Sequence, residues 1–178
     1  FAASKSPTAT NAQSQALGVR MSIVDKTVVK SAIDKATAEF TDRISSMGFK
    51  RTKKWFWVRE SEISADFIHL HLDGISYGAP ISYSVSFRAH TGYRHYSDDF
   101  EALALNGPCS SDANLREKRY HHRFNAKSGS TYERCLDDLV RFTKEVSEPW
   151  LNKQNSSSQV SEEFKNKSLK LLGIKRAK

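Results

Sequence analysis

Two stretches in which apolar and polar residues alternate, 67–72 and 81–90, constrain the fold more than any other feature of this chain. The apolar positions are Ile68, Leu70, Leu72, Ile81, Tyr83, Val85, Phe87 and Ala89. The positions between them carry Phe67, His69, His71, Ser82, Ser84, Ser86, Arg88 and His90. Alternation with a period of two is typical of strands that bury one face. The pattern therefore predicts two strands of an antiparallel hairpin with one apolar face.

The connection between the two strands, through Gly74 to Gly78, sets the expected register. With Asp73 opposite Pro80, the predicted pairs are His71 with Ser82, His69 with Ser84 and Phe67 with Ser86. The second face of the hairpin then presents imidazoles, serine hydroxyls and a guanidinium. That face is either a site or a hydrated sheet surface, and it is the candidate functional surface of the chain.

Length and charge distribution limit the class of protein. A chain of 178 residues fits one domain on the usual prior of about 100 to 200 residues. The net charge of +8 comes mostly from the ends, because residues 21–157 hold 20 basic and 18 acidic residues. A nearly balanced middle with basic ends favours solvated tails over a specific nucleic-acid site, although the tails leave nucleic-acid binding open.

The two cysteines, Cys109 and Cys135, have neither metal-binding nor redox spacing. We therefore expect a reducing, cytoplasmic compartment, and no cofactor is expected. No run of about 18 apolar residues is present, so the sequence predicts no membrane partner.

Composition divides the chain into three parts. Residues 1–20 are rich in Ala, Ser, Thr and Gln without a hydrophobic period, which is typical of a disordered segment, a processed leader or a remnant of expression. Residues 21–152 form the expected single α+β domain. Residues 153–178 combine a Ser-rich linker with a short basic amphipathic helix that Gly173 would end.

Two longer helices are predicted by apolar side chains spaced three and four residues apart. The first covers 27–47 and ends at Gly48, a residue suited to a left-handed cap. The second covers 130–151, where Ser130 and Glu133 have the spacing of a capping box. Pro149 near its end marks a kink or a fresh first turn.

Further strands complete the expected sheet. Residues Trp55–Arg59 predict a first strand whose two tryptophans share one face and whose Phe and Val side chains share the other. Residues Arg119–Phe124 predict a fourth strand after a long connection, 91–114, in which Phe100–Leu105 is the expected helical turn. The prediction is an α+β fold: an antiparallel meander of about four strands packed against an N-terminal and a C-terminal helix.

Four segments carry a resemblance to a known family: Met47-Gly48-Phe49-Lys50 after the first helix, the Trp55-Phe56-Trp57 strand, the alternating Ile81–Ala89 strand, and Glu148-Pro149-Trp150-Leu151 in the closing helix. Over about residues 28–152 the chain resembles small uncharacterised bacterial domains that occur among the immunity proteins of toxin and contact-dependent inhibition systems. The resemblance implies a non-catalytic binding domain whose sheet face or loop blocks a toxin. It transfers no individual site residue.

The histidines of the hairpin suggest two kinds of chemistry. A metal site would need a third ligand beside His69 and His71, and no carboxylate has a suitable spacing, so no metal is expected. A ribonuclease-like site would use His69, His71 and His90 as acid and base, with Arg88 to hold a phosphate. The same residue types recur at His121, His122 and Arg123.

Aromatic residues suggest a third role, because RNA bases stack on exposed rings. The candidates are Trp55, Trp57 and Phe67, with Lys53, Lys54 and Arg88 for the phosphates. We expect instead that the aromatic rings pack beneath the two helices, which need apolar surface to cover.

The interpretation that these patterns favour is a non-catalytic protein-binding module, an immunity protein that neutralises a toxin. Its expected contact residues are His69, His71, Ser82, Ser84, Ser86, Arg88, His90, Tyr93 and Arg94. The alternative is a small His-dependent nuclease or RNA-binding protein that uses His69, His71 and Arg88 of the same face.

Overall fold

The computed structural model of the 178-residue chain describes residues 24–72, 82–96, 106–112, 115, 120–154, 166 and 169–174. Several expectations lie outside these residues. They concern the segment 1–20, the Gly74–Gly78 connection, the Phe100–Leu105 turn and residues 155–165 of the linker.

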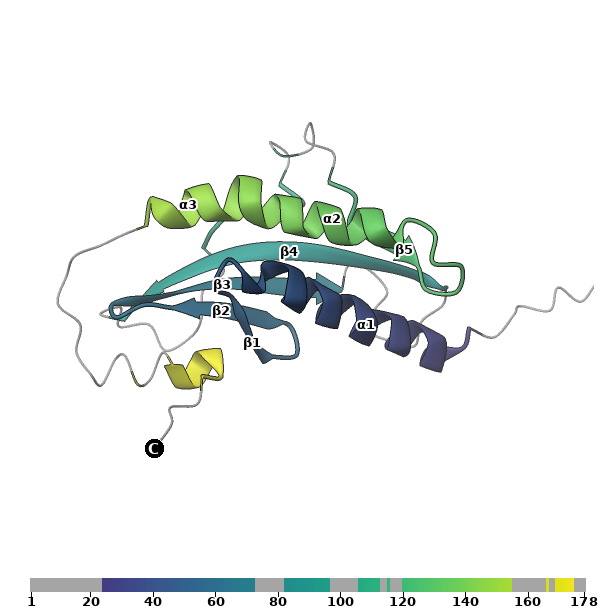
Figure 1. Cartoon of the computed structure of the whole chain (residues 1–178), viewed down its shortest axis with the longest axis horizontal. Helices are drawn as coiled ribbons and strands as arrows, with labels where there is room; N and C mark the ends of the chain where they lie inside the picture. Colours follow the sequence, from purple (N-terminus) through teal and green to yellow (C-terminus); the bar gives the residue numbers. More distant parts are fainter. Residues whose placement is uncertain are drawn as a thin grey trace, which may run out of the picture.

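Five antiparallel strands form one sheet in the order β1-β2-β3-β4-β5 (Figure 1). They are β1 (Lys50–Lys53), β2 (Phe56–Glu60), β3 (Ser64–Leu72), β4 (Ser84–His95) and β5 (Arg123–Asn125). The meander confirms the predicted α+β fold, with one strand more than expected. The additional strand is β1, a basic segment that pairs with β2 so that Arg51 lies opposite Trp57.

All the long helical segments lie on one side of the sheet (Figure 1). They are α1 (Lys26–Ser45), α2 (Tyr132–Phe142), the π-helical turn η3 (Thr143–Ser147) and α3 (Glu148–Asn152). Asp25 caps α1, because its Oδ1 accepts the N–H of Thr27 at 2.8 Å. The chain leaves α1 at Gly48, whose φ of +85° confirms the predicted left-handed turn. Pro149 lies in the first turn of α3, where its missing N–H is tolerated.

The capping box predicted at the start of α2 is wrong. The N-cap is Thr131, at φ 62°, and its side chain forms no capping hydrogen bond. Its hydroxyl instead donates to the carbonyl of Arg123 at 2.8 Å, which ties the start of the helix to β5. Gly129 and Thr131 both have positive φ, and this tight turn moves the helix start one residue beyond Ser130.

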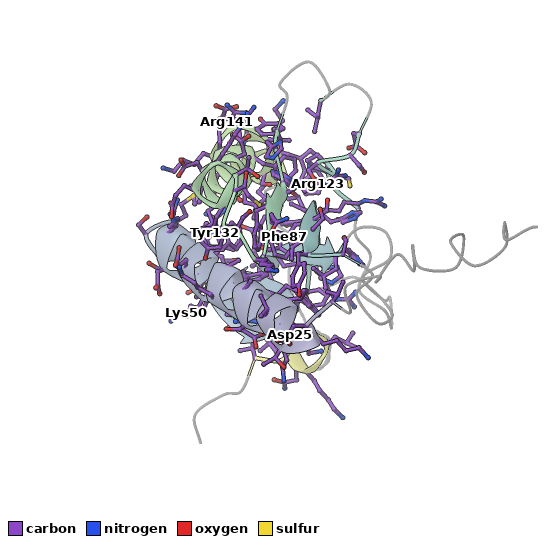
Figure 2. All side chains as sticks on the ribbon, turned by 90° about the vertical axis from the view of Figure 1, so that its right-hand side faces the viewer. Asp25, Lys50, Phe87, Arg123, Tyr132 and Arg141 are labelled. Atoms are coloured by element: carbon purple, nitrogen blue, oxygen red, sulfur yellow. The ribbon has the colours of Figure 1, made fainter. Side chains whose placement is uncertain are left out.

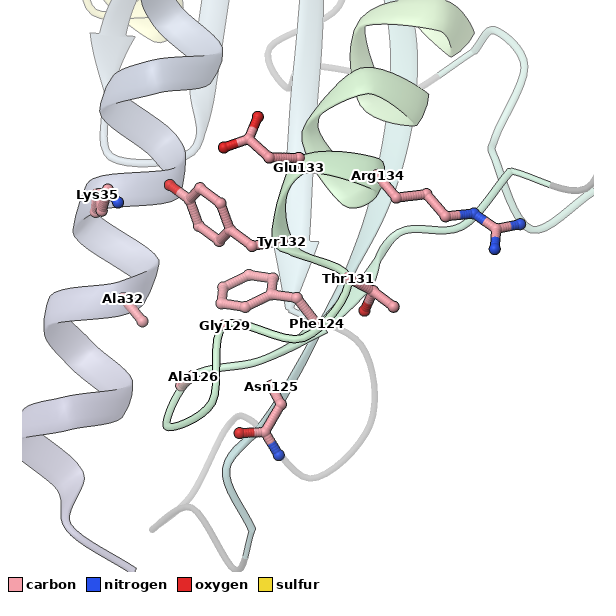
Figure 3. A pocket seen from close by; sticks show the side chains of 10 residues that line it. All are labelled: Ala32, Lys35, Phe124, Asn125, Ala126, Gly129, Thr131, Tyr132, Glu133 and Arg134. Carbon is pink, nitrogen blue, oxygen red and sulfur yellow. The ribbon is translucent and has the colours of Figure 1, made fainter.

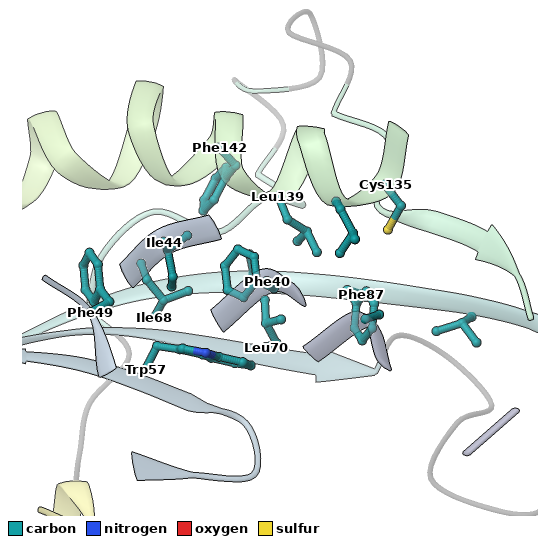
Figure 4. Packing of buried hydrophobic residues seen from close by; sticks show 14 of the residues in the cluster. Phe40, Ile44, Phe49, Trp57, Ile68, Leu70, Phe87, Cys135, Leu139 and Phe142 are labelled. Carbon is teal, nitrogen blue, oxygen red and sulfur yellow. The ribbon is translucent and has the colours of Figure 1, made fainter. Parts of the chain in front are cut away.

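The main core lies between the helices and the sheet (Figure 4). Trp57 is fully buried there, with its ring edge-on to Phe40 at 5.0 Å between centroids. The indole N–H donates to Oγ1 of Thr41 at 2.8 Å. The tryptophan of β2 therefore packs under α1 as expected, and it offers no stacking surface to a nucleic acid.

A second, smaller core lies on the opposite face of the sheet. It contains Val58, Ala65, Phe67, Tyr96, Leu169 and Leu172. Residues 169–174 cover this end of the sheet, and Oγ1 of Thr52 donates to the carbonyl of Leu172 at 2.6 Å. Phe67 shares its face with the histidines, as predicted, but it is fully buried beneath this C-terminal segment.

The register predicted for the central hairpin is wrong. The observed pairs include His69 with His90, His71 with Arg88 and Leu72 with Phe87. In the observed pairing β4 continues to His95, which lies opposite Ser64. The shift is an even number of residues, so each side chain keeps its predicted face. Ile68, Leu70, Val85, Phe87 and Ala89 accordingly lie in the main core.

The connection predicted at 91–114 and the fourth strand predicted at Arg119–Phe124 also need correction. Residues 91–95 belong to β4, and β5 contains only Arg123–Asn125, opposite Ser84–Ser86. The part of the β4 edge that β5 does not cover forms backbone hydrogen bonds with residues 107–110. For example, the N–H of Thr91 donates to the carbonyl of Pro108 at 2.9 Å. Among the described residues, no helix is long and apolar enough to cross a membrane.

Candidate functional site

Six polar side chains of β3 and β4 lie on the sheet face opposite the helices. We call them the histidine face: His69, His71, Ser84, Ser86, Arg88 and His90. Ser84 is exposed and the other five are partly exposed. The corrected register makes this group tighter than predicted, because it brings His90 directly beside His69 and Arg88 beside His71.

The three imidazoles form a cluster. Ring centroids are 4.0 Å apart for His69 and His71, 5.0 Å for His71 and His90, and 6.5 Å for His69 and His90. Phe56 stacks on His69 at 4.1 Å and fixes the plane of that ring. At the other side, Sγ of Cys109 lies 3.5 Å from Nε2 of His90. The cluster is therefore held by its neighbours on both sides.

Burial and mutual proximity keep these imidazoles neutral at pH 7. Burial, followed by the charges of His71 and His90, lowers the pKa of His69 to about 4. Burial has the larger effect in lowering the pKa of His71, and the positive charge of Arg88 also lowers it. For His90, burial, His71 and Arg88 lower the pKa, and Asp112 offsets them only in part.

Neutral imidazoles limit what the face can do chemically. A ribonuclease-like mechanism needs one charged histidine to protonate the leaving oxygen, and low pKa values remove that acid at neutral pH. In the described part of the chain, no three His, Cys, Asp or Glu side chains are arranged to hold a metal ion. Each neutral imidazole can still donate one hydrogen bond and accept one. Nδ1 of His69 has no hydrogen-bond partner among the described residues.

The remaining predicted contact residues do not join the histidine face. Ser82 is exposed just before β4, where its Oγ accepts the N–H of Ser84 at 3.3 Å. Tyr93 points to the opposite face and packs against the main core. Arg94 is only 4% exposed.

A pocket of about 330 Å³ adjoins the histidine face where β5 meets β4. It is lined by Ser86, Phe87, Arg88, Ser110, Ser111, Tyr120, His121, His122 and Arg123. The sequence indicated the histidines and Arg123 as reactive residue types, but Ser110 and Ser111 follow no pattern. Only the hydrogen bonds between residues 107–110 and β4 bring them here.

Another hollow, of about 430 Å³, lies between α1 and the start of α2 (Figure 3). Its charged groups are occupied locally. The ammonium of Lys35 lies 4.9 Å from the ring centroid of Tyr132, and Glu133 binds Arg43 at 2.7 Å. This hollow therefore reflects the packing of α1 against α2.

Lowering the pH should destabilise the protein through His122. This side chain is only 8% exposed and packs near the Phe142 ring. Burial lowers the pKa of His122 to about 4 from an ordinary 6.5, so between these values the unfolded chain binds a proton that the folded chain excludes. Stability from this group is complete above pH 6.5 and is lost as the pH falls toward 4. We expect a loss of about 2 kcal/mol at pH 5.

Urea unfolding at pH 7 and pH 5 measures this effect. His122→Gln should shrink the difference between the two pH values by about 2 kcal/mol, because glutamine does not titrate. An unchanged pH dependence in His122→Gln would contradict the assignment.

Comparison with known proteins returned no relative. No family model matches the chain, and neither the curated proteins nor the solved structures contain a significant match. The resemblance to toxin-immunity domains therefore stays a prediction.

Proposed function

We propose that this chain is a non-catalytic protein-binding module whose histidine face contacts the partner. The observation that carries the proposal is a cluster of neutral imidazoles and serine hydroxyls on two paired strands, opposite the face that the helices cover. Such groups form hydrogen bonds in either direction and cost less to desolvate than charges. The strands hold them in place before binding, which lowers the entropy cost of association.

A protein partner is favoured over a nucleic acid by two observations. Of the three rings that could stack bases, Trp57 and Phe67 are fully buried, and Trp55 is partly exposed. Most of the net charge of +8 comes from residues 1–20 and 158–178, and residues 21–157 are nearly balanced. We further propose that the partner is a cognate bacterial toxin, as the resemblance of residues 28–152 implies. The compartment we propose is the cytoplasm, a choice supported by the two buried, unpaired thiols of Cys109 and Cys135.

The alternative, a small nuclease, is supported by one observation. The three imidazoles and Arg88 supply the residue types for proton transfer and phosphate binding in one cluster. In that case the low pKa values would have to rise when a phosphate binds.

A hydrolysis assay separates the two functions. We expect the purified chain to leave single-stranded RNA and DNA uncleaved at about pH 7, because the lowered pKa values of His69, His71 and His90 leave the histidine face without a charged imidazole to act as the acid. The double variant His69→Ala/His71→Ala should behave identically. Cleavage by the wild type that the double variant loses would overturn the binding proposal and establish the nuclease.

A further inference from the structure

We propose that the pocket between β5, β4 and residues 106–112 binds a phosphomonoester group. Its polar lining includes two guanidiniums, three serine hydroxyls, a tyrosine hydroxyl and two imidazoles: Arg88, Arg123, Ser86, Ser110, Ser111, Tyr120, His121 and His122. No carboxylate is among the lining residues that the structure describes. A site rich in hydrogen-bond donors, with positive charge and no carboxylate, suits a phosphate.

The strands place the two arginines on one wall. Ser86 lies opposite Arg123 in the β4–β5 pairing, so their side chains share a face, and Arg88 follows two residues along β4. The pairing continues past β5, because the N–H of Phe87 donates to the carbonyl of His122 at 2.8 Å. Arg123 and Phe87 lie close together in Figure 2. This wall is therefore fixed by backbone hydrogen bonds.

The opposite wall is formed by Ser110 and Ser111, which belong to the segment 106–112. The N–H of Ser110 donates to the carbonyl of Ala89 at 2.8 Å, and Oγ of Ser110 accepts the N–H of Ala89 at 2.9 Å. Because the Ser110 hydroxyl acts there as an acceptor, its own hydrogen can point to a ligand. Ser111 lies beside it, with its Oγ 3.0 Å from Sγ of Cys109.

Two lining groups have no described partner that a ligand would need to displace. The guanidinium of Arg123 forms no ion pair with any described residue, and Nε2 of His121 is buried without a hydrogen-bond partner there. Two carboxylates bonded to lining residues are already engaged. Asp138 accepts the N–H of His121 at 2.7 Å and pairs with Arg141 at 3.2 Å, and Glu145 accepts the hydroxyl of Tyr120 at 2.9 Å. A doubly charged phosphomonoester can satisfy both lining groups at once.

A pocket of about 330 Å³ is near the lower limit for small-molecule sites, which favours a phosphate with a small attached group. The same chemistry occurs in a free nucleotide and at the phosphorylated end of a nucleic acid. The site shares Ser86 and Arg88 with the histidine face, whereas Arg123 and His121, its two groups without a described partner, lie outside that face.

Calorimetric titration with adenosine 5′-monophosphate, with adenosine as the ligand lacking phosphate, tests the proposal. The wild type should bind the monophosphate and not adenosine. Arg123→Gln should weaken binding at least tenfold, because the bidentate donor is lost. Arg134→Gln removes an equally exposed arginine on α2, outside this pocket, and should leave affinity within twofold.

Circular dichroism confirms that each variant is folded. A 5′-phosphorylated oligonucleotide in a parallel titration distinguishes a free nucleotide from a nucleic-acid end. The proposal is overturned if the wild type binds neither phosphorylated ligand, if adenosine binds as well as its monophosphate, or if the two arginine variants lose affinity equally.

Discussion

Replacing Trp57 with alanine should lower the free energy of unfolding by about 3 to 5 kcal/mol, the range for large aromatic side chains removed from a core. The ring is fully buried, contacts Phe40 edge-on and bonds Thr41 through its N–H. The variant would leave a cavity under α1. The Thr41 hydroxyl would lose the hydrogen bond it accepts from the indole and keep the one it donates to the Thr37 carbonyl at 2.7 Å. Since Trp57 joins α1 to the middle of β2, its loss weakens the helix–sheet contact directly.

Trp55→Ala is the matched control. Trp55 has the same chemistry, two residues away and on the same face, but it is only partly buried. Urea unfolding should show a loss less than half that of Trp57→Ala. Equal losses for the two variants would contradict the assignment of Trp57 as the central core residue.

The second large effect concerns Phe67, which fills the small core beneath the C-terminal segment. Phe67→Ala should cost about 3 to 5 kcal/mol. Gly92 lies opposite Phe67, and a Cβ added there would lie only 2.1 Å from the ring. Gly92→Ala should therefore also destabilise the fold, by about 1 to 3 kcal/mol, because the ring must move.

The two changes should not be additive. Once the Phe67 ring is removed, the methyl group that Gly92→Ala introduces has room. Gly92→Ala should therefore lower the free energy of unfolding only slightly in the Phe67→Ala background. A double-mutant cycle by urea unfolding should give a coupling on the order of 1 to 3 kcal/mol. Additive losses would show that the ring does not fill the space above Gly92.

The faces of the sheet could be predicted from the sequence, whereas the register could not. Alternation assigns Ile68 and Val85 to the core in every register that differs from the observed one by an even number of residues. The register depends on the connection between β3 and β4 and on where β4 ends. Strand β4 ends at His95, after Thr91 and Gly92, which do not continue the apolar pattern.

The candidate site was predictable to a similar extent. His69 and His71 followed from alternation, but the contact of His90 with His69 needed the register. The contact between Cys109 and His90 could not be predicted, because Cys109 belongs to a segment whose apolar residues follow neither a helical nor a strand pattern. That segment is bonded to the edge of β4. The burial of Phe67 depends on residues 169–172, which are far away in the sequence.

The most direct test of the account is the stoichiometry of the complex with the protein encoded beside this gene, since an immunity gene adjoins its toxin gene. Ser84→Glu places a charge on the exposed edge of the histidine face, and Ser31→Glu places the same charge at an exposed position of α1, on the other side of the sheet. The account predicts an equimolar complex for the wild type and Ser31→Glu, with an affinity about tenfold lower or worse for Ser84→Glu. An unweakened Ser84→Glu complex, or equal weakening in both variants, would contradict it.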